Sequence, residues 1–88
     1  MTANEFLKEQ VLNHLKTTYP KAYIGEGNGI YDLFLILKGK FIALKLKSDN
    51  RPLSQKVAKA INDIISAGGH YFIIFTLDDL IDELEKFN

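Results

Sequence analysis

The N-terminal segment carries apolar residues at helical spacing. At about 100° per residue, four of them fall on one stripe of an amphipathic helix over residues 3–18: Leu7, Val11, Leu12 and Leu15. Pro20 is expected to end this helix. Residues 21–25 predict a short strand, and the glycine-rich residues 26–29 predict a loop.

The middle of the chain contains two apolar runs on either side of Lys38-Gly39, a pattern typical of a tight β-hairpin. Both runs are apolar at successive positions and do not alternate with polar residues. Each strand is therefore expected to be buried on both faces, inside a sheet.

The last third predicts a helix, a strand and a second helix. Ser54 is a suitable N-cap for a helix running to about Ala67, which Gly68-Gly69 would end. Residues 71–75 predict a strand, and Thr76 with Asp79 forms a capping box before the final helix. The core-facing residues of the two helices are expected to be Val57, Ile61, Ile64, Leu80, Ile81 and Leu84. The expected fold is α/β in the order α-β-β-β-α-β-α, with a mixed sheet of about four strands flanked by helices.

Composition limits the class of protein. Eighty-eight residues with 47% hydrophobic content predict a single domain over residues 1–88 with a genuine core. The absence of cysteine excludes disulfides, thiol catalysis and cysteine-ligated zinc. No segment resembles a signal peptide or a membrane span, so a protein that is not membrane-bound, in a reducing cytoplasm, is expected.

The net charge of zero conceals an uneven distribution. Residues 38–59 carry seven basic residues and one acid, whereas residues 78–88 carry five acids and one base. A basic stretch of this kind can form a surface for a polyanion, or it can be an ordinary solvated surface. If it binds DNA, the expected contacts are Lys38, Lys40, Arg51, Lys56 and Lys59.

The hairpin also predicts a cluster of charges. If the chain turns through Lys38 and Gly39 alone, Asp32 faces Lys45, with Cβ atoms about 5 Å apart. Lys47 shares the face of Lys45 because side chains alternate along a strand. Charged groups at the end of two apolar strands are costly to bury without a purpose. The alternative is a strand-end salt bridge between Asp32 and Lys45, with Lys47 in solvent.

An acid at the head of one strand, a tight hairpin and a lysine two residues beyond the facing position resemble the PD-(D/E)XK nuclease core. The chain is most similar to the stand-alone virus-type replication-repair nucleases. Tyr31-Asp32 stands where that family usually has Pro-Asp, and Lys45-Leu46-Lys47 where it has Glu-x-Lys. Ser54-Gln55 and the segment 67–71 (AGGHY) match its later motifs.

The resemblance implies a metal-dependent endonuclease acting on DNA. Asp32, the Leu46 backbone carbonyl and a glutamate of the first helix would ligate Mg²⁺ or Mn²⁺, with Glu5 preferred to Glu9. Lys47 would stabilise developing negative charge, and Gln55 would orient the lysine or the water.

The same resemblance implies branched or structured DNA as substrate and a homodimer, as in junction-resolving enzymes. A phage-encoded protein in a bacterial host would fit it. A non-catalytic nucleic-acid-binding module and a small protein-interaction domain remain open as alternatives.

Lys45 is the main departure from the family pattern, because it replaces a carboxylate with a cation. At about 4 Å and an effective dielectric constant near 20, each unit-charge interaction is about 4 kcal/mol before solvation. Lys45 is therefore expected to weaken metal binding and cleavage. His14 and His70 are isolated in sequence and are expected to be structural. The glycine-rich loop leads into a strand, which argues against a phosphate-binding loop before a helix.

Overall fold

The computed structural model describes residues 2–27 and 29–87. The elements follow the expected α-β-β-β-α-β-α order. Their bounds are α1 (Ala3–Thr18), β1 (Tyr23–Glu26), β2 (Leu33–Leu37), β3 (Lys40–Leu46), α2 (Gln55–Ser66), β4 (His70–Ile74) and α3 (Leu77–Glu85). Residue 28, in the expected loop over 26–29, lies outside the described part of the chain.

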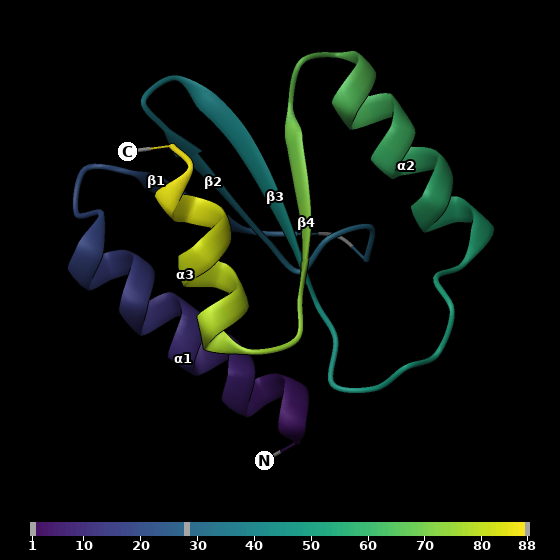
Figure 1. The fold of residues 1–88 in the computed structure, drawn as a ribbon, viewed down its shortest axis with the longest axis horizontal. Coiled ribbons are helices and arrows are strands. Elements are labelled where there is room, and N and C mark those ends of the chain that lie inside the picture. The colour runs from purple at the N-terminus through teal and green to yellow at the C-terminus, as the bar shows by residue number, and fades with distance from the viewer. Residues whose placement is uncertain (1, 28, 88) are drawn as a thin grey trace.

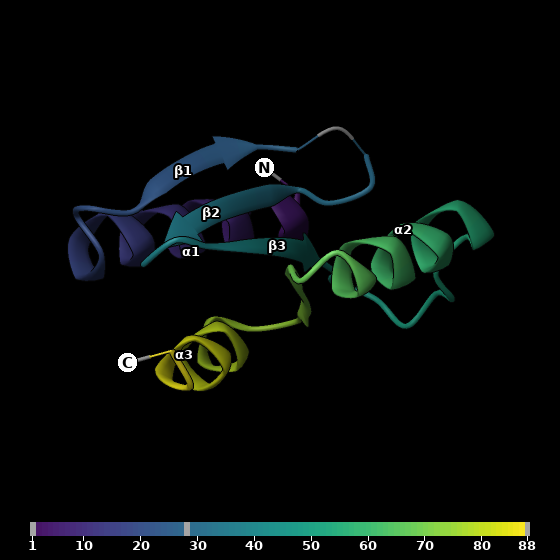
Figure 2. The same cartoon turned by 90° about the horizontal axis from the view of Figure 1, so that it is seen from above.

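The four strands form one mixed sheet in the order β1-β2-β3-β4. The first three strands pair antiparallel, and β4 pairs parallel to β3 after the crossover through α2. α1 and α3 lie side by side on one face of the sheet, and α2 lies on the opposite side, packed against β3 and β4 (Figure 1). In the view from above, α3 and α2 lie on opposite sides of β4 (Figure 2).

The predicted turn of the hairpin is confirmed. Leu37 pairs with Lys40, so only Lys38 and Gly39 form the turn. Both have positive φ, 53° and 81°, as a type I′ turn requires. This turn fixes the register of β2 against β3, and thereby decides which side chains of the two strands meet.

The predicted ends of the helices are also confirmed. Ser54 Oγ accepts the Val57 N–H at 3.2 Å, and Thr76 with Asp79 forms the full capping box. Gly68 ends the second helix with φ of 94°. α1 ends at Thr18, just before the expected stop at Pro20.

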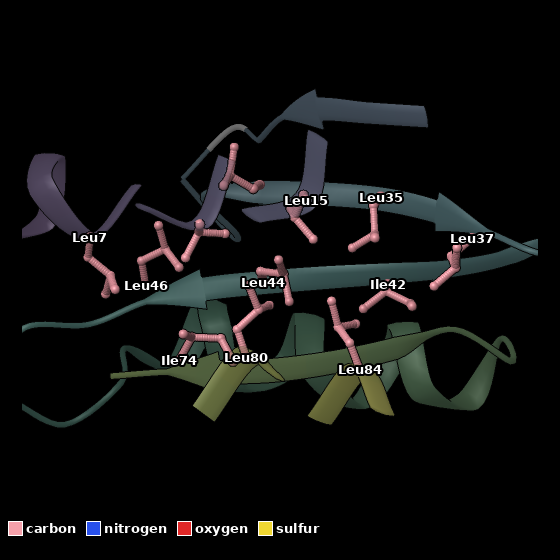
Figure 3. Packing of buried hydrophobic residues seen from close by; sticks show 12 residues of the cluster. Leu7, Leu15, Leu35, Leu37, Ile42, Leu44, Leu46, Ile74, Leu80 and Leu84 are labelled. Carbon is pink, nitrogen blue, oxygen red and sulfur yellow. The ribbon is translucent and has the colours of Figure 1, made fainter. Parts of the chain in front are cut away.

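The larger core lies between the sheet and the α1–α3 pair (Figure 3). It contains the alternate residues of β2 and β3 that point to this side, together with the apolar stripes of the helices. Its fully buried members include Val11, Leu15, Leu33, Leu35, Ile42, Leu44, Ile74, Leu80 and Leu84.

The smaller core lies on the opposite face of the sheet. There Ala43 and Tyr71 pack against Val57 of α2, with Ile61 and Ile64 partly buried around them. Because α2 covers only the β3–β4 side, Ile36 of β2 remains 41% exposed. The expectation that both hairpin strands are buried on both faces is therefore wrong for β2.

Candidate functional site

Asp32 lies where the regular pairing of β2 with β3 stops. The last regular pair is Leu33 with Leu44, and the Asp32 N–H also donates to the Leu44 carbonyl, at 2.9 Å. One extra residue on one strand is the arrangement of a β-bulge. The Asp32 carboxylate then reaches across the end of β3, where Oδ2 accepts the Leu46 N–H at 2.7 Å.

Lys45 contacts this carboxylate, although Asp32 and Lys45 are not the regular strand pair that the hairpin register predicts. Its Nζ lies 3.9 Å from Asp32 Oδ2, and the two side chains are 21% and 35% exposed. Since both groups retain contact with water, the net stabilisation by this pair is small, on the order of 1 kcal/mol or less. The main consequence is chemical, because a cation already lies beside the Asp32 carboxylate.

Lys47 is the most buried of the basic side chains here, at 13% exposed. Its Nζ donates to the Arg51 carbonyl at 2.6 Å and lies 3.7 Å from Asp49 Oδ1. The loop after β3 therefore folds back over the Lys47 ammonium. The Lys47 ammonium, which was expected to lie beside an attacking water, is bound by protein oxygens.

Hydrogen bonds between Asp49 and Arg51 stabilise the loop after β3. The Arg51 Nε and backbone N–H both donate to the Asp49 carboxylate, each at 3.0 Å. These hydrogen bonds, with the charge of Arg51 and Lys47, lower the pKa of Asp49 below its ordinary value. Arg51 itself is 85% exposed, so its guanidinium remains accessible to an anion.

A polar pocket of about 370 Å³ opens at the end of β3, between α1 and the start of α2. We call it the β3–α2 pocket. Three basic side chains and one acid line it, together with polar and apolar groups; the lining is Asn4, Gly29, Lys45, Leu46, Lys47, Ser48, Asp49, Arg51, Pro52, Leu53, Ser54 and Val57. This excess of positive charge suits a phosphate group better than a metal ion.

The first helix contributes an amide to this pocket. Asn4 Nδ2 lies 3.5 Å from the Leu46 carbonyl, the oxygen expected to ligate a metal. Glu5 is exposed, and its carboxylate accepts the Thr2 hydroxyl at 3.0 Å at the helix N-terminus. Glu5 therefore does not line the β3–α2 pocket, where it was expected to ligate a metal. Glu9 is also exposed and does not line this pocket.

Gln55 is the first residue of α2, directly after the pocket residue Ser54, and it is exposed. The two histidines lie elsewhere. His14 lies near the Thr18 hydroxyl, and His70 packs edge-on against Phe87 with ring centroids 4.7 Å apart.

Tyr71 is a residue of the site that the sequence did not reveal. Its hydroxyl donates to the Ile30 carbonyl at 2.5 Å. Burial, assisted by the negative charge of Asp32, raises the pKa of Tyr71 to about 12. In the sequence it is one aromatic in an apolar strand, and only the parallel pairing of β3 with β4 brings it near Asp32.

The basic stretch of residues 38–59 does not form one surface. Lys38 Nζ donates to the Phe87 carbonyl at 3.4 Å, and Lys40 Nζ lies 5.2 Å from the centre of the Phe87 ring. Both are at the hairpin tip, the opposite end of β3 from Lys45. On α2, Lys56 is exposed and Lys59 pairs with Asp63 at 3.0 Å. Of the expected DNA contacts, only Arg51 lines the β3–α2 pocket.

The oxygen set does not fit a divalent cation. Asp32 is the one carboxylate expected at the strand ends, Lys45 stands beside it, and Asn4 approaches the Leu46 carbonyl. Within residues 2–27 and 29–87, no three His, Asp, Glu or Cys side chains are close enough to share a metal ion. Mg²⁺ prefers several oxygen ligands in octahedral geometry, so the site as it stands favours an anion.

Over the same residues, no helix has the length and apolar character needed to cross a membrane. Comparison with known proteins gave no match to a family model, a curated protein or a solved structure.

Proposed function

We propose that this chain is a DNA-binding domain of nuclease type whose metal-dependent endonuclease activity is weakened or lost at Lys45. The observation that supports this most directly is the Lys45 ammonium, 3.9 Å from Asp32 Oδ2. In the replication-repair nucleases that the sequence resembles, the position of Lys45 carries a glutamate that would help to hold the metal.

The ammonium supplies one positive charge near the place where the cation would sit. It can attract a phosphate, but it has no open coordination position with which to activate water. The Lys45 ammonium and the exposed Arg51 guanidinium would hold a phosphodiester without a metal. No step of hydrolysis follows from the residues present.

Branched or structured DNA is the proposed substrate class, and a homodimer with two such pockets is the proposed assembly. Both rest on the resemblance to junction-resolving enzymes. The exposed Arg51 guanidinium at the pocket is compatible with a duplex or a single strand.

A second candidate function is a module that binds nucleic acid and has no cleavage activity at all. The contacts of the potential ligands favour it, since the Leu46 carbonyl is approached by Asn4 and Lys47 is held by the Arg51 carbonyl. Restoring one carboxylate would then be insufficient for catalysis.

The Lys45→Glu variant tests the proposal. It should cleave a four-way DNA junction in Mg²⁺ or Mn²⁺ well above the wild-type level, because a carboxylate replaces the cation beside Asp32. Adding Asp32→Ala to this variant should abolish the cleavage. Lys21→Glu, the same charge change at an exposed loop residue, is the matched control and should leave cleavage at the wild-type level.

A folded Lys45→Glu protein that binds the junction but never cuts it would overturn the nuclease proposal in favour of the binding module. Failure of every variant to bind DNA at low salt would overturn both, because phosphate contacts are strongest at low ionic strength.

A further inference from the structure

The face of the sheet opposite α1 and α3 is left partly open. Alternation along the strands places Tyr23, Phe34, Ile36 and Phe41 on this side, since Tyr23 pairs with Ile36 and Ile36 with Phe41. We call these four residues the open face. Tyr23 and Ile36 are 65% and 41% exposed, and both phenylalanines are half-buried.

The aromatic rings of the open face form a connected group. The ring centroids of Phe34 and Phe41 are 5.6 Å apart, with the planes inclined by 23°. Tyr23 adds a third ring, 5.9 Å from Phe34. A Cβ on Gly25 would lie 2.4 Å from the Phe34 ring, so this ring lies flat across β1 and occupies the room that the glycine leaves.

The open face continues into the β3–α2 pocket. Phe41, Ala43 and Lys45 alternate on the same side of β3, and same-side residues of a strand are about 6.6 Å apart. Tyr31 joins the two areas, because its ring packs edge-on against both Phe34 and Phe41 and it precedes Asp32 in the chain. A row of rings therefore leads to the pocket in which Lys45 and Arg51 retain contact with water.

Aromatic rings beside a basic pocket are suited to bind an unpaired nucleic-acid strand. Unstacked bases pack on aromatic side chains, and the phosphates bind to the positive groups. A duplex cannot use such rings, because its bases are already stacked inside the helix.

We infer that the open face binds unpaired bases of a nucleic-acid strand whose phosphate lies in the β3–α2 pocket. This inference rests on the proposed function for the nature of the ligand, and it deepens that proposal by assigning specificity for single-stranded segments. It requires neither a metal ion nor cleavage.

The test is fluorescence anisotropy of labelled twelve-nucleotide (dT)₁₂ and of a twelve-base-pair duplex, at low salt with EDTA. The full chain should bind the single strand more tightly than the duplex. Tyr23→Ala should weaken single-strand binding roughly tenfold, the effect of losing one stacked base, and leave duplex binding nearly unchanged.

Phe6→Ala is the matched control. Phe6 is 56% exposed on α1, so its loss also removes an exposed ring but not one of the open face. It should leave both affinities unchanged. Ile36→Ala should weaken single-strand binding less than Tyr23→Ala, because it removes apolar contact without a ring.

Equal effects of Tyr23→Ala and Phe6→Ala, equal affinity for duplex and single strand, or no binding of (dT)₁₂ would each overturn the inference. Sedimentation of the same proteins identifies the rival occupant. If Tyr23→Ala dissociates a dimer and leaves DNA affinity unchanged, the open face is a contact between copies of this chain.

The outcome is separable from that of the nuclease test. A chain that loses (dT)₁₂ binding with Tyr23→Ala, yet never cuts as Lys45→Glu, would support the open face and refute the nuclease proposal.

Discussion

Lys45 and Asp32 meet at the end of two strands whose other residues are almost all apolar. The two-residue turn brings them to the same end of the hairpin, because it fixes the pairing of the two strands as far as Leu33 and Leu44, and the side chains meet beyond the last regular pair. The sequence therefore predicted the contact of the two side chains without knowledge of any helix position, but not the bulge at Asp32 that ends the regular pairing.

Asn4 and Tyr71 could not be found in this way. Their places in the site depend on how α1 docks against the sheet and on the parallel pairing of β4, both of which are long-range packing. On the helical wheel Glu5 lies closer to the apolar stripe than Glu9 does. In the structure, however, the Glu5 carboxylate accepts a hydrogen bond from the Thr2 hydroxyl at the N-terminus of α1.

Asp32 is predicted to support the fold as well as the site. Asp32→Ala removes the acceptor of the Leu46 N–H and leaves Lys45 without its partner, which should lower the free energy of unfolding by about 1–3 kcal/mol. Asp32→Asn keeps an acceptor oxygen and should cost less. Urea unfolding measures both, with the exposed Asp82→Ala as control. Equal stability of Asp32→Ala and Asp82→Ala would contradict this role.

The raised pKa of Tyr71 predicts that the folded protein loses stability at alkaline pH. Its pKa is about 12 in the folded protein and 10.0 ordinarily, so between these values the folded state holds a proton that the unfolded state has lost. Stability should be complete below pH 10 and fall as the pH rises towards 12, by up to about 2 kcal/mol.

Tyr71→Phe should remove this part of the pH dependence, although it also loses the hydrogen bond to the Ile30 carbonyl. Urea unfolding at pH 9 and pH 11 measures the difference between the two proteins. The same loss of stability in both would refute the assignment to Tyr71.

Among the elements, the hairpin was the most predictable because its signals are local. The capping residues Ser54 and Thr76 and the stop at Gly68 were equally local, and each is observed. β1 begins two residues later than expected and β4 one residue earlier, since strand ends depend on the partner strand.

Burial on the second face of the hairpin was not predictable. Apolar residues at successive positions indicate two covered faces, but the open face has the same composition without a covering helix. The pattern cannot distinguish a residue that packs against its own chain from one that is available to a ligand.

The turn predicts opposite effects of two neighbouring substitutions. Gly39→Ala places a Cβ at φ of 81° and should lower the free energy of unfolding by about 1 kcal/mol. Lys38→Asn should raise it by up to about 1 kcal/mol, since asparagine tolerates positive φ better than lysine. Urea denaturation checks both, and a neutral Gly39→Ala would contradict the type I′ turn.

For the whole molecule, the positions of the basic residues along β3 and α2 determine which charges act together. The seven basic residues of 38–59 lie within one stretch of the sequence, but the length of β3 separates those at the hairpin tip from those at the β3–α2 pocket. Counting charge along the chain could not reveal this division, because it arises from the extended length of the strand. The helix α3, which carries most of the C-terminal acidic residues, lies on the other side of the sheet from α2 (Figure 1).

The central claim is that Lys45 takes the place of a metal ligand beside Asp32. Mn²⁺ titration followed by amide NMR tests it most directly, because the ion broadens only the signals close to its binding site. Lys45→Glu should show broadening centred on the Asp32 and Leu46 amides, whereas the wild type and Lys21→Glu should not. Equal broadening in all three proteins, or none at Asp32 in Lys45→Glu, would contradict the account.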